Sequence, residues 1–436
     1  MTISSSLNAG VTGLNVNASR LATISDNIAN SATYGYKRAT ADFHSLVLDQ
    51  SRGAYSAGGV RVTTARAVNQ NGTLTTTNNP TDLSIAGRGM IPITSITAAT
   101  SGTGPLPMSL TSTGSFRADA DGILRTASGH VLLGWPADAN GVVPDFPRDS
   151  ATDLRPVRVG ANEIDGNPTS RITLDVNLPA TDTQAGAPAV TRVLPIEYFG
   201  NLGESQNLDV TFTPTPPTPP ATASNTWTMD VREAGSATSL ANVSITFDAT
   251  SANGGTIAAV PPAGMTPPGA YDATTGLLTV TTPGGPLEIY IGQTNDPRGL
   301  SQLSNTFLPS VSKDGSPVGI LASIEVDAQG MLSAVYDSGF TKTLYQIPVV
   351  DVPNTNGLRP LSNQAYQVSA ESGPFYLWDA GDGPVGDVIG YSREESTTDV
   401  ASELTQLIQT QRAYSSNAKV IQTVDEMLQE TTNIKR

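Results

Sequence analysis

The sequence contains no cysteine in 436 residues, so no disulfide can stabilise its fold. It has only two histidines, His44 and His130, and neither has a companion at the spacing of a metal site. No run of 18 apolar residues is present, and a membrane-spanning helix needs about that length. We therefore predict no metal, no cofactor and no membrane insertion.

Basic residues are also scarce. The chain has 24 Lys and Arg against 39 Asp and Glu, a net charge of −15. This balance argues against nucleic acid and anionic membrane surfaces, which proteins bind through basic patches. The first residues, MTISSSLNAG, lack the basic start and apolar run of a secretory signal. If the chain is exported, we expect a route without a cleavable signal peptide.

Gly, Pro, Thr, Ser and Asn are abundant, with 41 Gly and 31 Pro. Charged residues make up only 14%, against roughly 25% in an average protein. This composition favours many short strands joined by turns. A chain of this length usually forms more than one domain, since single cores rarely exceed about 250 residues.

Both ends of the chain have a different pattern, in which apolar residues recur at alternating steps of four and three. This spacing is typical of a helix that meets another helix along a narrow seam. Asp399 is an N-cap signal for the second helix, and we expect the first to end near Asn30 and the second to fray after Leu428. The predicted assembly seam consists of Leu7, Val11, Leu14, Ala18, Leu21, Ile28, Leu404, Leu407, Tyr414, Ala418, Ile421 and Leu428.

An ordinary amphipathic core helix is the simpler interpretation of one such stripe. Most proteins have frayed chain ends. Apolar stripes at both ends of this chain therefore indicate that each terminal helix is stabilised by a partner, most simply by the other one. A helix of about 27 residues is roughly 40 Å long, too long for a small domain to bury. Gly10 and Gly13 weaken the first helix, so neighbours must support it. We predict that the two helices pair with each other as a coiled coil, and that helices from other copies of the chain then pack against this pair.

If the ends pair, the domains between them must be nested. The sequence has strand and turn patterns at about 60–147 and again at about 305–370, with turns at Asp121-Gly122, Ser128-Gly129, Gln329-Gly330 and Ser338-Gly339. We predict an α+β multidomain fold with nested, discontinuous all-β domains. Its parts are a terminal helical domain (1–30 with 398–436), an extended connecting region (31–71 with 371–397), an inner β-domain (72–147 with 305–370) and an outer β-domain (148–304).

Catalytic signatures are poorly represented. We find no nucleophile elbow, phosphate loop or dinucleotide fingerprint. Asp119-x-Asp121-Gly122 faintly resembles a calcium loop, but no Glu follows at the twelfth position, so a hairpin turn is the better interpretation. We predict no catalytic residue and no enzyme activity.

Two motifs are much more specific. After the first helix comes a stretch that predicts a helix end, a turn, a positive φ at Gly35 and an apolar anchor at Tyr36. It resembles the N-x-A-N-x-x-T-x-G-Y-K signature of bacterial flagellar rod and hook proteins. The fixed positions are Asn27, Ala29, Asn30, Thr33, Gly35, Tyr36 and Lys37. The last helix is similar to the C-terminal motif of the same family, at Gln411, Arg412 and Asn417.

The resemblance covers roughly 1–135 and 310–436 and leaves 148–304 unmatched. Rod proteins are shorter, so the long insertion favours the hook. Two departures are Ser396-Thr397-Thr398-Asp399-Val400, where hook proteins usually read Ser-Asn-Val-Asp-Leu, and Met90-Ile91 in place of an aromatic pair. The alternatives are a rod or junction subunit, or a secreted adhesin-like β-protein.

The resemblance implies a flexible, helical, tubular homopolymer that joins the rod to the filament as a universal joint and transmits motor torque. Terminal helices would line an export channel, and β-domains would face outward. The implied partners are the distal rod, a hook cap and the hook–filament junction proteins. The implied location is the extracellular flagellar hook, reached by type III export.

Overall fold

The structure, a computed structural model, describes residues 3–46, 58–101, 106–138, 141–160, 164–261, 265–267 and 270–434. It combines terminal helices with many strands in more than one domain, as predicted. The chain forms two compact units. Unit 1 comprises residues 1–161, 323–335 and 341–436, and unit 2 comprises residues 162–322 and 336–340. Unit 2 is therefore an insertion between two halves of unit 1.

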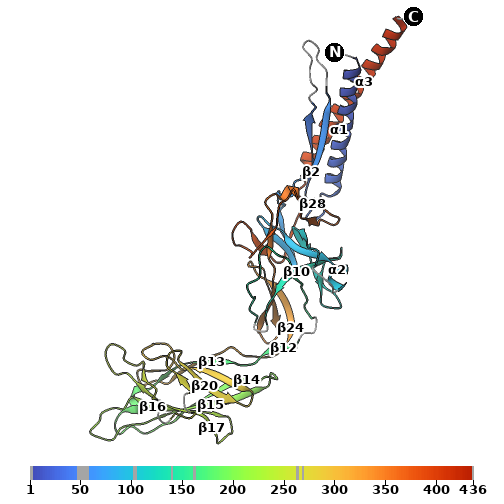
Figure 1. Cartoon of the computed structure of the whole chain (residues 1–436). Coiled ribbons are helices and arrows are strands. Elements are labelled where there is room, and N and C mark those ends of the chain that lie inside the picture. The colour runs from blue at the N-terminus through green and yellow to red at the C-terminus, as the bar shows by residue number, and fades with distance from the viewer. Residues whose placement is uncertain are drawn as a thin grey trace. The chain divides into compact units, whose positions relative to one another are not determined.

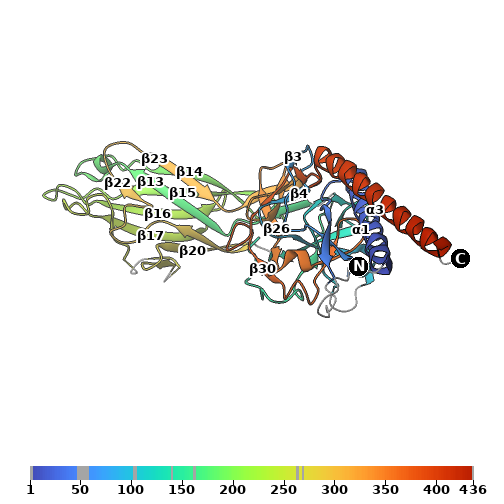
Figure 2. The same ribbon diagram turned by 90° about the horizontal axis from the view of Figure 1, so that it is seen from above.

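Helix α1 (Ile3–Ala29) and helix α3 (Val400–Ile434) lie side by side in unit 1 (Figures 1 and 2). The end of α1 matches the prediction. The Asp399 carboxylate accepts the Ala401 N–H at 2.9 Å, which confirms the N-cap of α3. Helix α3 continues past Leu428 to Ile434. A short helix, α2 (Ile96–Ser101), follows the fifth strand.

The main sheet of unit 1 contains β25 (Met331–Tyr336), β26 (Thr341–Gln346), β10 (His130–Pro136), β5 (Ile91–Ser95), β6 (Ser109–Thr111), β29 (Tyr366–Gln367) and β28 (Arg359–Pro360), in that order. Strands β11 (Arg155–Pro156) and β9 (Leu124–Arg125) both pair with β10, and β8 (Arg117–Ala118) pairs with β9. The predicted turn at Asp121-Gly122 joins β8 to β9, and the one at Gln329-Gly330 leads into β25, so both are confirmed. The turns at Ser128-Gly129 and Ser338-Gly339 are likewise confirmed.

Smaller sheets of unit 1 join its outgoing and returning halves, where β3 (Leu74–Thr76) pairs with β32 (Ser392–Glu394), and β4 (Asp82–Ala86) pairs with both β31 (Asp387–Ile389) and β7 (Thr113–Ser115). Others lie within one half, namely β1 (Ala39–Ser45) with β2 (Val60–Arg66) and β27 (Val349–Asp351) with β30 (Tyr376–Trp378). The two halves also share a core around Trp135, to which Met90 and Val350 contribute. Neither half could bury this core alone.

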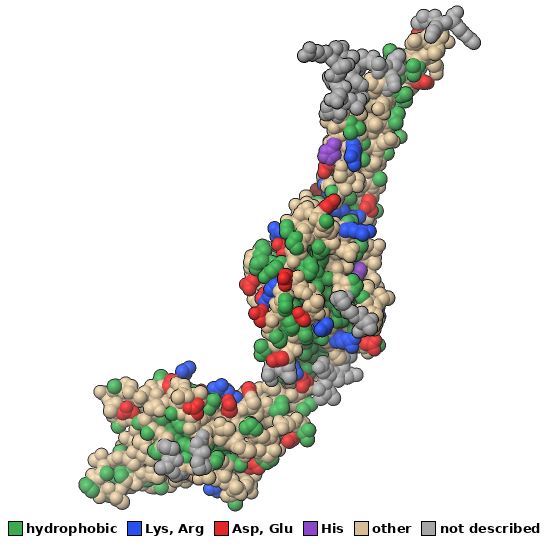
Figure 3. All heavy atoms as spheres, in the orientation of Figure 1, with side chains coloured by type: hydrophobic (Ala, Val, Ile, Leu, Met, Phe, Trp, Pro, Cys, Tyr) green, Lys and Arg blue, Asp and Glu red, His purple; other side chains and the backbone are tan. Residues whose placement is uncertain are grey.

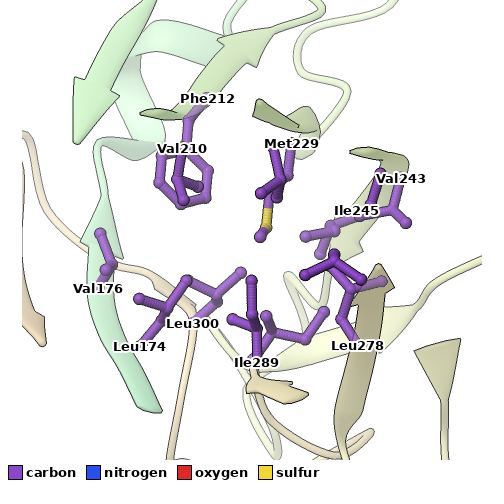
Figure 4. Packing of buried hydrophobic residues seen from close by; sticks show 14 of the residues in the cluster. Leu174, Val176, Val210, Phe212, Met229, Val243, Ile245, Leu278, Ile289 and Leu300 are labelled. Atoms are coloured by element: carbon purple, nitrogen blue, oxygen red, sulfur yellow. The ribbon is translucent and has the colours of Figure 1, made fainter. Parts of the chain in front are cut away.

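Unit 2 is a sandwich of two sheets. One sheet contains β19 (Tyr271–Asp272), β20 (Leu277–Thr282), β21 (Gly285–Tyr290), β13 (Arg171–Leu178), β22 (Ser301–Gln302) and β23 (Leu308–Lys313). The other contains β14 (Arg192–Phe199), β15 (Ser205–Pro214), β16 (Thr226–Glu233), β17 (Ser239–Phe247) and β18 (Ile257–Ala259). Alternate residues of β13, β15, β17 and β20 are buried, and buried residues of the two sheets point toward one another, as Figure 4 shows for Leu174 and Met229.

The boundaries of unit 2 differ from residues 148 and 304, the predicted ends of the outer β-domain. Strand β11 pairs with β10, so residues 148–161 belong to unit 1. Strand β23 pairs with β13, so residues 305–322 belong to unit 2. Strand β24 (Ser316–Val326) contributes to both units, pairing with β12 (Ile164–Asn167) in unit 2 and with β25. The finer division into four parts stays a prediction.

Candidate functional site

Helices α1 and α3 approach one another closely through small residues. They run antiparallel, since Gly10 faces Ile421 and Gly13 faces Asn417. A Cβ at Gly10 would lie 2.9 Å from Ile421 Cγ1, and one at Gly13 would lie 2.9 Å from Asn417 Nδ2. Any larger residue would therefore require the Ile421 or Asn417 side chain, or the helices themselves, to shift. The close packing explains why two helix-weakening glycines stand in α1.

The contact lies on a different face of α1 from the predicted stripe. The buried positions that follow three- and four-residue steps are Gly10, Gly13, Asn17, Ile24 and Asn27. Each lies one residue before a position of the predicted stripe, a rotation of about 100° around the helix. The contacts at Gly10 and Gly13 thus lie beside the predicted stripe of α1, and the role of the stripe residues as an assembly seam stays a prediction. Small and polar side chains, which sequence periodicity ignores, make much of that contact.

The predicted seam residues are instead only partly covered within the chain. Leu7, Leu14, Leu21, Ile28, Leu407 and Ile421 are half-buried. Those left exposed are Val11 (43% exposed), Leu404 (47%), Tyr414 (40%), Leu428 (38%), Ala18 and Ala418. Figure 3 shows hydrophobic side chains recurring among polar ones along the helices. An apolar surface thus remains available on the helix pair.

The turn after α1 is closed by its own motif residues. The Asn30 Nδ2 donates to the Asp26 carbonyl oxygen at 2.8 Å, and the Thr33 N–H donates to the Asn30 carbonyl oxygen at 3.1 Å. Gly35 adopts the predicted positive φ of 69°, and a Cβ there would lie 2.8 Å from Thr113 Cγ2. These contacts reverse the chain directly behind α1. Ala29, also in the motif, is exposed.

Tyr36 lies buried where the chain leaves the turn, and polar side chains surround its ring and hydroxyl. It is only 4% exposed, and its hydroxyl lies 2.9 Å from Asp26 Oδ2 and 3.1 Å from Asn27 Oδ1. The Arg66 guanidinium lies over its ring, 4.9 Å from the centroid. Burial and the hydrogen bond to Asp26 raise the pKa of Tyr36 to about 12. The phenol is therefore fixed in its neutral form at the base of the helix.

Two ion pairs connect this motif to the returning chain. The Lys37 Nζ lies 2.8 Å from Glu394 Oε1, and their side chains are 2% and 4% exposed. Lys37 also donates to the Gln70 carbonyl oxygen at 2.7 Å, and the Gly72 N–H donates to Glu394 at 2.6 Å. The motif lysine thus joins the start of unit 1 to strand β32.

The second ion pair is made by Arg38, the residue directly after the motif, and connects it to α3. The Arg38 Nε donates to the fully buried carboxylate of Glu403, and Asn27 Nδ2 donates to the same oxygen at 3.2 Å. Asn27 also pairs with the Ala39 backbone, donating to its carbonyl oxygen at 2.9 Å and accepting from its N–H at 2.8 Å. This motif asparagine, near the end of α1, therefore contacts both α3 and the first strand.

Sequence reasoning missed Glu394, Thr397 and Glu403. Glu403 lies in the first turn of α3, where an acidic residue is expected simply to complement the helix dipole. Thr397 accepts the Arg38 N–H at 2.8 Å, within the segment that departs from the hook pattern. No local signal identifies any of the three, because each partner is more than 350 residues away in the chain.

The C-terminal motif is mostly turned away from α1. Gln411 and Arg412 are exposed, whereas Asn417 packs against Gly13. Within the described ranges, no group of three acidic or histidine side chains could hold a metal ion. Over those same ranges, no helix has the length and hydropathy to cross a membrane.

Comparison with known proteins first defines the class. The family described as Flagella basal body rod protein matches residues 7–37, and Flagellar basal body rod FlgEFG protein C-terminal matches residues 390–434. These segments are the two helices and the motif that joins them to the β-rich units. They assign both ends of the chain to axial proteins of the bacterial flagellum.

Full-length relatives then identify the family. The flagellar hook protein FlgE of Brucella suis biovar 1 is 31% identical, and that of Rhizobium meliloti is 30% identical, each over the whole of both chains. The Escherichia coli K12 protein of the same name is 24% identical over 98% of each chain. A Helicobacter pylori hook protein structure, FlgE2, aligns with a TM-score of 0.49 and 12% identity over 74% of this chain and 99% of its own. The chain belongs to the flagellar hook protein family and is a structural subunit of the bacterial flagellar hook.

Proposed function

We propose that this subunit polymerises into a flexible tube, with the terminal helices as its inner wall around an export channel and the β-rich units outside. The tube would join the rod to the filament and transmit motor torque. The observation that supports this most is the apolar surface left uncovered on the helix pair. Leu404, Tyr414 and Leu428 remain 38–47% exposed on α3.

The packing within the subunit explains why that surface is free. Gly10 and Gly13 bring the helices together without using the larger side chains of the stripe. Fully burying a Leu contributes roughly 1.5–3 kcal/mol, so burying the remaining exposed part of each contributes a fraction of this. Summed along two helices and over many copies, such contacts favour a polymer over the free subunit.

The remaining proposals follow from the family. The partners would be further copies of the chain, the distal rod, a hook cap and the hook–filament junction proteins. The polymer would be extracellular, and the subunit would be exported without a cleavable signal peptide. Its role would be structural, without catalysis.

A charge on the exposed stripe tests this proposal. Leu404→Asp should raise the subunit concentration needed for tube formation at least about tenfold, because a carboxylate would have to be desolvated at each contact. Thr405→Asp, at the next and also exposed position, is the matched control and should have a much smaller effect. Circular dichroism checks that both variants keep their helices. Equal assembly of the two variants, measured by sedimentation and electron microscopy, would contradict the proposal.

A further inference from the structure

A cavity of about 450 Å³ opens on unit 1 beside the turn that follows α1. Five separate parts of the chain line it. They are the turn at Tyr34, strand β8 with Arg117, the β9–β10 turn that ends at His130, the loop at Asn363 and Gln364, and strand β32 with Arg393. The proposed assembly surface on the helices does not include these residues.

The cavity is cationic although the chain is strongly acidic. Arg117 and Arg393 line it, and no Asp or Glu is among the described residues that do. Burial lowers the pKa of His130, so its ring is neutral at neutral pH and the two guanidinium groups provide the charge. The whole chain has 39 acidic and 24 basic residues. A positive pocket on such a surface attracts carboxylates.

Polar atoms in the wall lack partners among the described residues. The Arg393 Nε and the His130 Nε2 are both buried and accept or donate no hydrogen bond there. The Arg393 guanidinium carbon lies over the Tyr34 ring, 3.9 Å from its centroid, a contact that uses none of the guanidinium's hydrogen-bond donors. A buried donor without a partner is costly, and a ligand oxygen would remove that cost.

Arg117 is incompletely paired. Its Nη1 lies 3.6 Å from Asp82 Oδ1, and its side chain is 60% exposed. The same Asp82 oxygen already accepts hydrogen bonds from Ser115 Oγ at 2.6 Å and Asn79 Nδ2 at 2.5 Å. Asp82 is therefore largely satisfied without Arg117. The Arg117 side chain can turn toward a second carboxylate at little cost.

We propose that this cavity binds an Asp or Glu side chain of a second copy of this chain. The inference rests on the proposed polymer. Two guanidinium groups suit the planar, bidentate geometry of a carboxylate. Subunits that each have a net charge of −15 repel one another, and a cationic pocket filled by a neighbour's carboxylate offsets part of that repulsion.

Cross-linking identifies the occupant. Arg117→Lys and Arg393→Lys keep the charge and supply an amine, which a carbodiimide joins to a carboxylate in direct contact. Tubes are assembled from a mixture of ¹⁴N- and ¹⁵N-labelled subunits, so that mass spectrometry separates links between subunits from links within one. We expect mixed-isotope peptide pairs that contain residue 117 or residue 393. Arg298→Lys, beside Asp296 at 2.8 Å in unit 2, is the control for reagent activity and should give a link within one subunit.

The double variant Arg117→Gln/Arg393→Gln measures the effect on assembly. It should need about tenfold more subunit to form tubes and should show a weaker dependence of assembly on salt. Thermal unfolding of the free subunit verifies that the fold is retained. Tubes that form from the double variant at the wild-type concentration, or tubes of the Lys variants whose only links are within one subunit, would overturn the inference. Absence of tubes from the wild-type chain would instead contradict the proposed function.

Discussion

The buried pair Lys37–Glu394 offers a direct test of how the two ends of unit 1 are held together. Lys37→Met keeps the length of the side chain and removes its charge. The Glu394 carboxylate, 4% exposed, would then keep the Gly72 N–H as its remaining hydrogen-bond donor in this cluster. Breaking one partner of a buried ion pair costs about 3–5 kcal/mol. We expect a loss of that size in the free energy of unfolding of unit 1.

Glu394→Gln should have an effect of similar size, since the buried Lys37 ammonium would lose its counter-charge and keep only neutral oxygens, such as the Gln70 carbonyl, as acceptors. The double variant Lys37→Met/Glu394→Met removes both charges and should lose much less than the sum of the two. A coupling energy of at least about 2 kcal/mol is therefore expected from the double-mutant cycle.

The assay is urea unfolding of the free subunit, monitored by hydrogen exchange. Exchange is measured peptide by peptide, so the unfolding of unit 1 and of unit 2 is reported separately. Unit 2 peptides serve as an internal reference and should not change. Arg298→Gln, at the exposed Arg298–Asp296 pair, is the matched control and should leave unit 1 unchanged. Additive single-variant effects, or losses in unit 1 below about 1 kcal/mol, would refute the reasoning.

Two further predictions concern the same end of unit 1. The pKa of Tyr36 is raised from 10.0 to about 12, so the folded state keeps a proton that the unfolded state loses, and stability should fall as pH rises from 10 through 12. Tyr36→Phe should make this fall shallower by up to about 3 kcal/mol without abolishing it, because Tyr366 has a similarly raised pKa. Identical alkaline unfolding curves of the variant and the wild type would contradict this. Gly10→Val should destabilise the helix pair by about 1–3 kcal/mol, since its Cβ would meet Ile421, whereas Val at the exposed Ala22 should cost about 0.5 kcal/mol. Hydrogen exchange of α1 measures both variants, and an equal effect would show that the helices do not approach as described.

Local signals in the sequence predicted the parts of the fold that local chemistry determines. The apolar steps and the Asp399 N-cap located both helices, and the turn at Asp121-Gly122 joins the strands that it was expected to join. The positive φ of Gly35 follows from its place after a helix end. Each of these features depends on a few neighbouring residues.

Which face of α1 contacts α3 could not be predicted in the same way. Apolar periodicity marks an apolar face whether or not the rest of the subunit covers it, and Leu404 on such a face remains exposed. The contact within the chain instead depends on how closely Gly10 and Gly13 let α3 approach. The same limit applies to Glu394 and Glu403, whose partners are distant in sequence. Propensity and spacing contain no information about such pairs.

The central claim is that the terminal helices build the polymer and that the β-rich units do not need them in order to fold. Deleting residues 1–30 removes α1 and its contacts with α3, and leaves the core of unit 2 intact. Negative-stain electron microscopy of the purified variant is the decisive measurement, with hydrogen exchange to confirm that unit 2 remains folded. We predict soluble subunits and no tubes at concentrations where the full chain assembles. Tubes formed by the truncated chain would contradict the account.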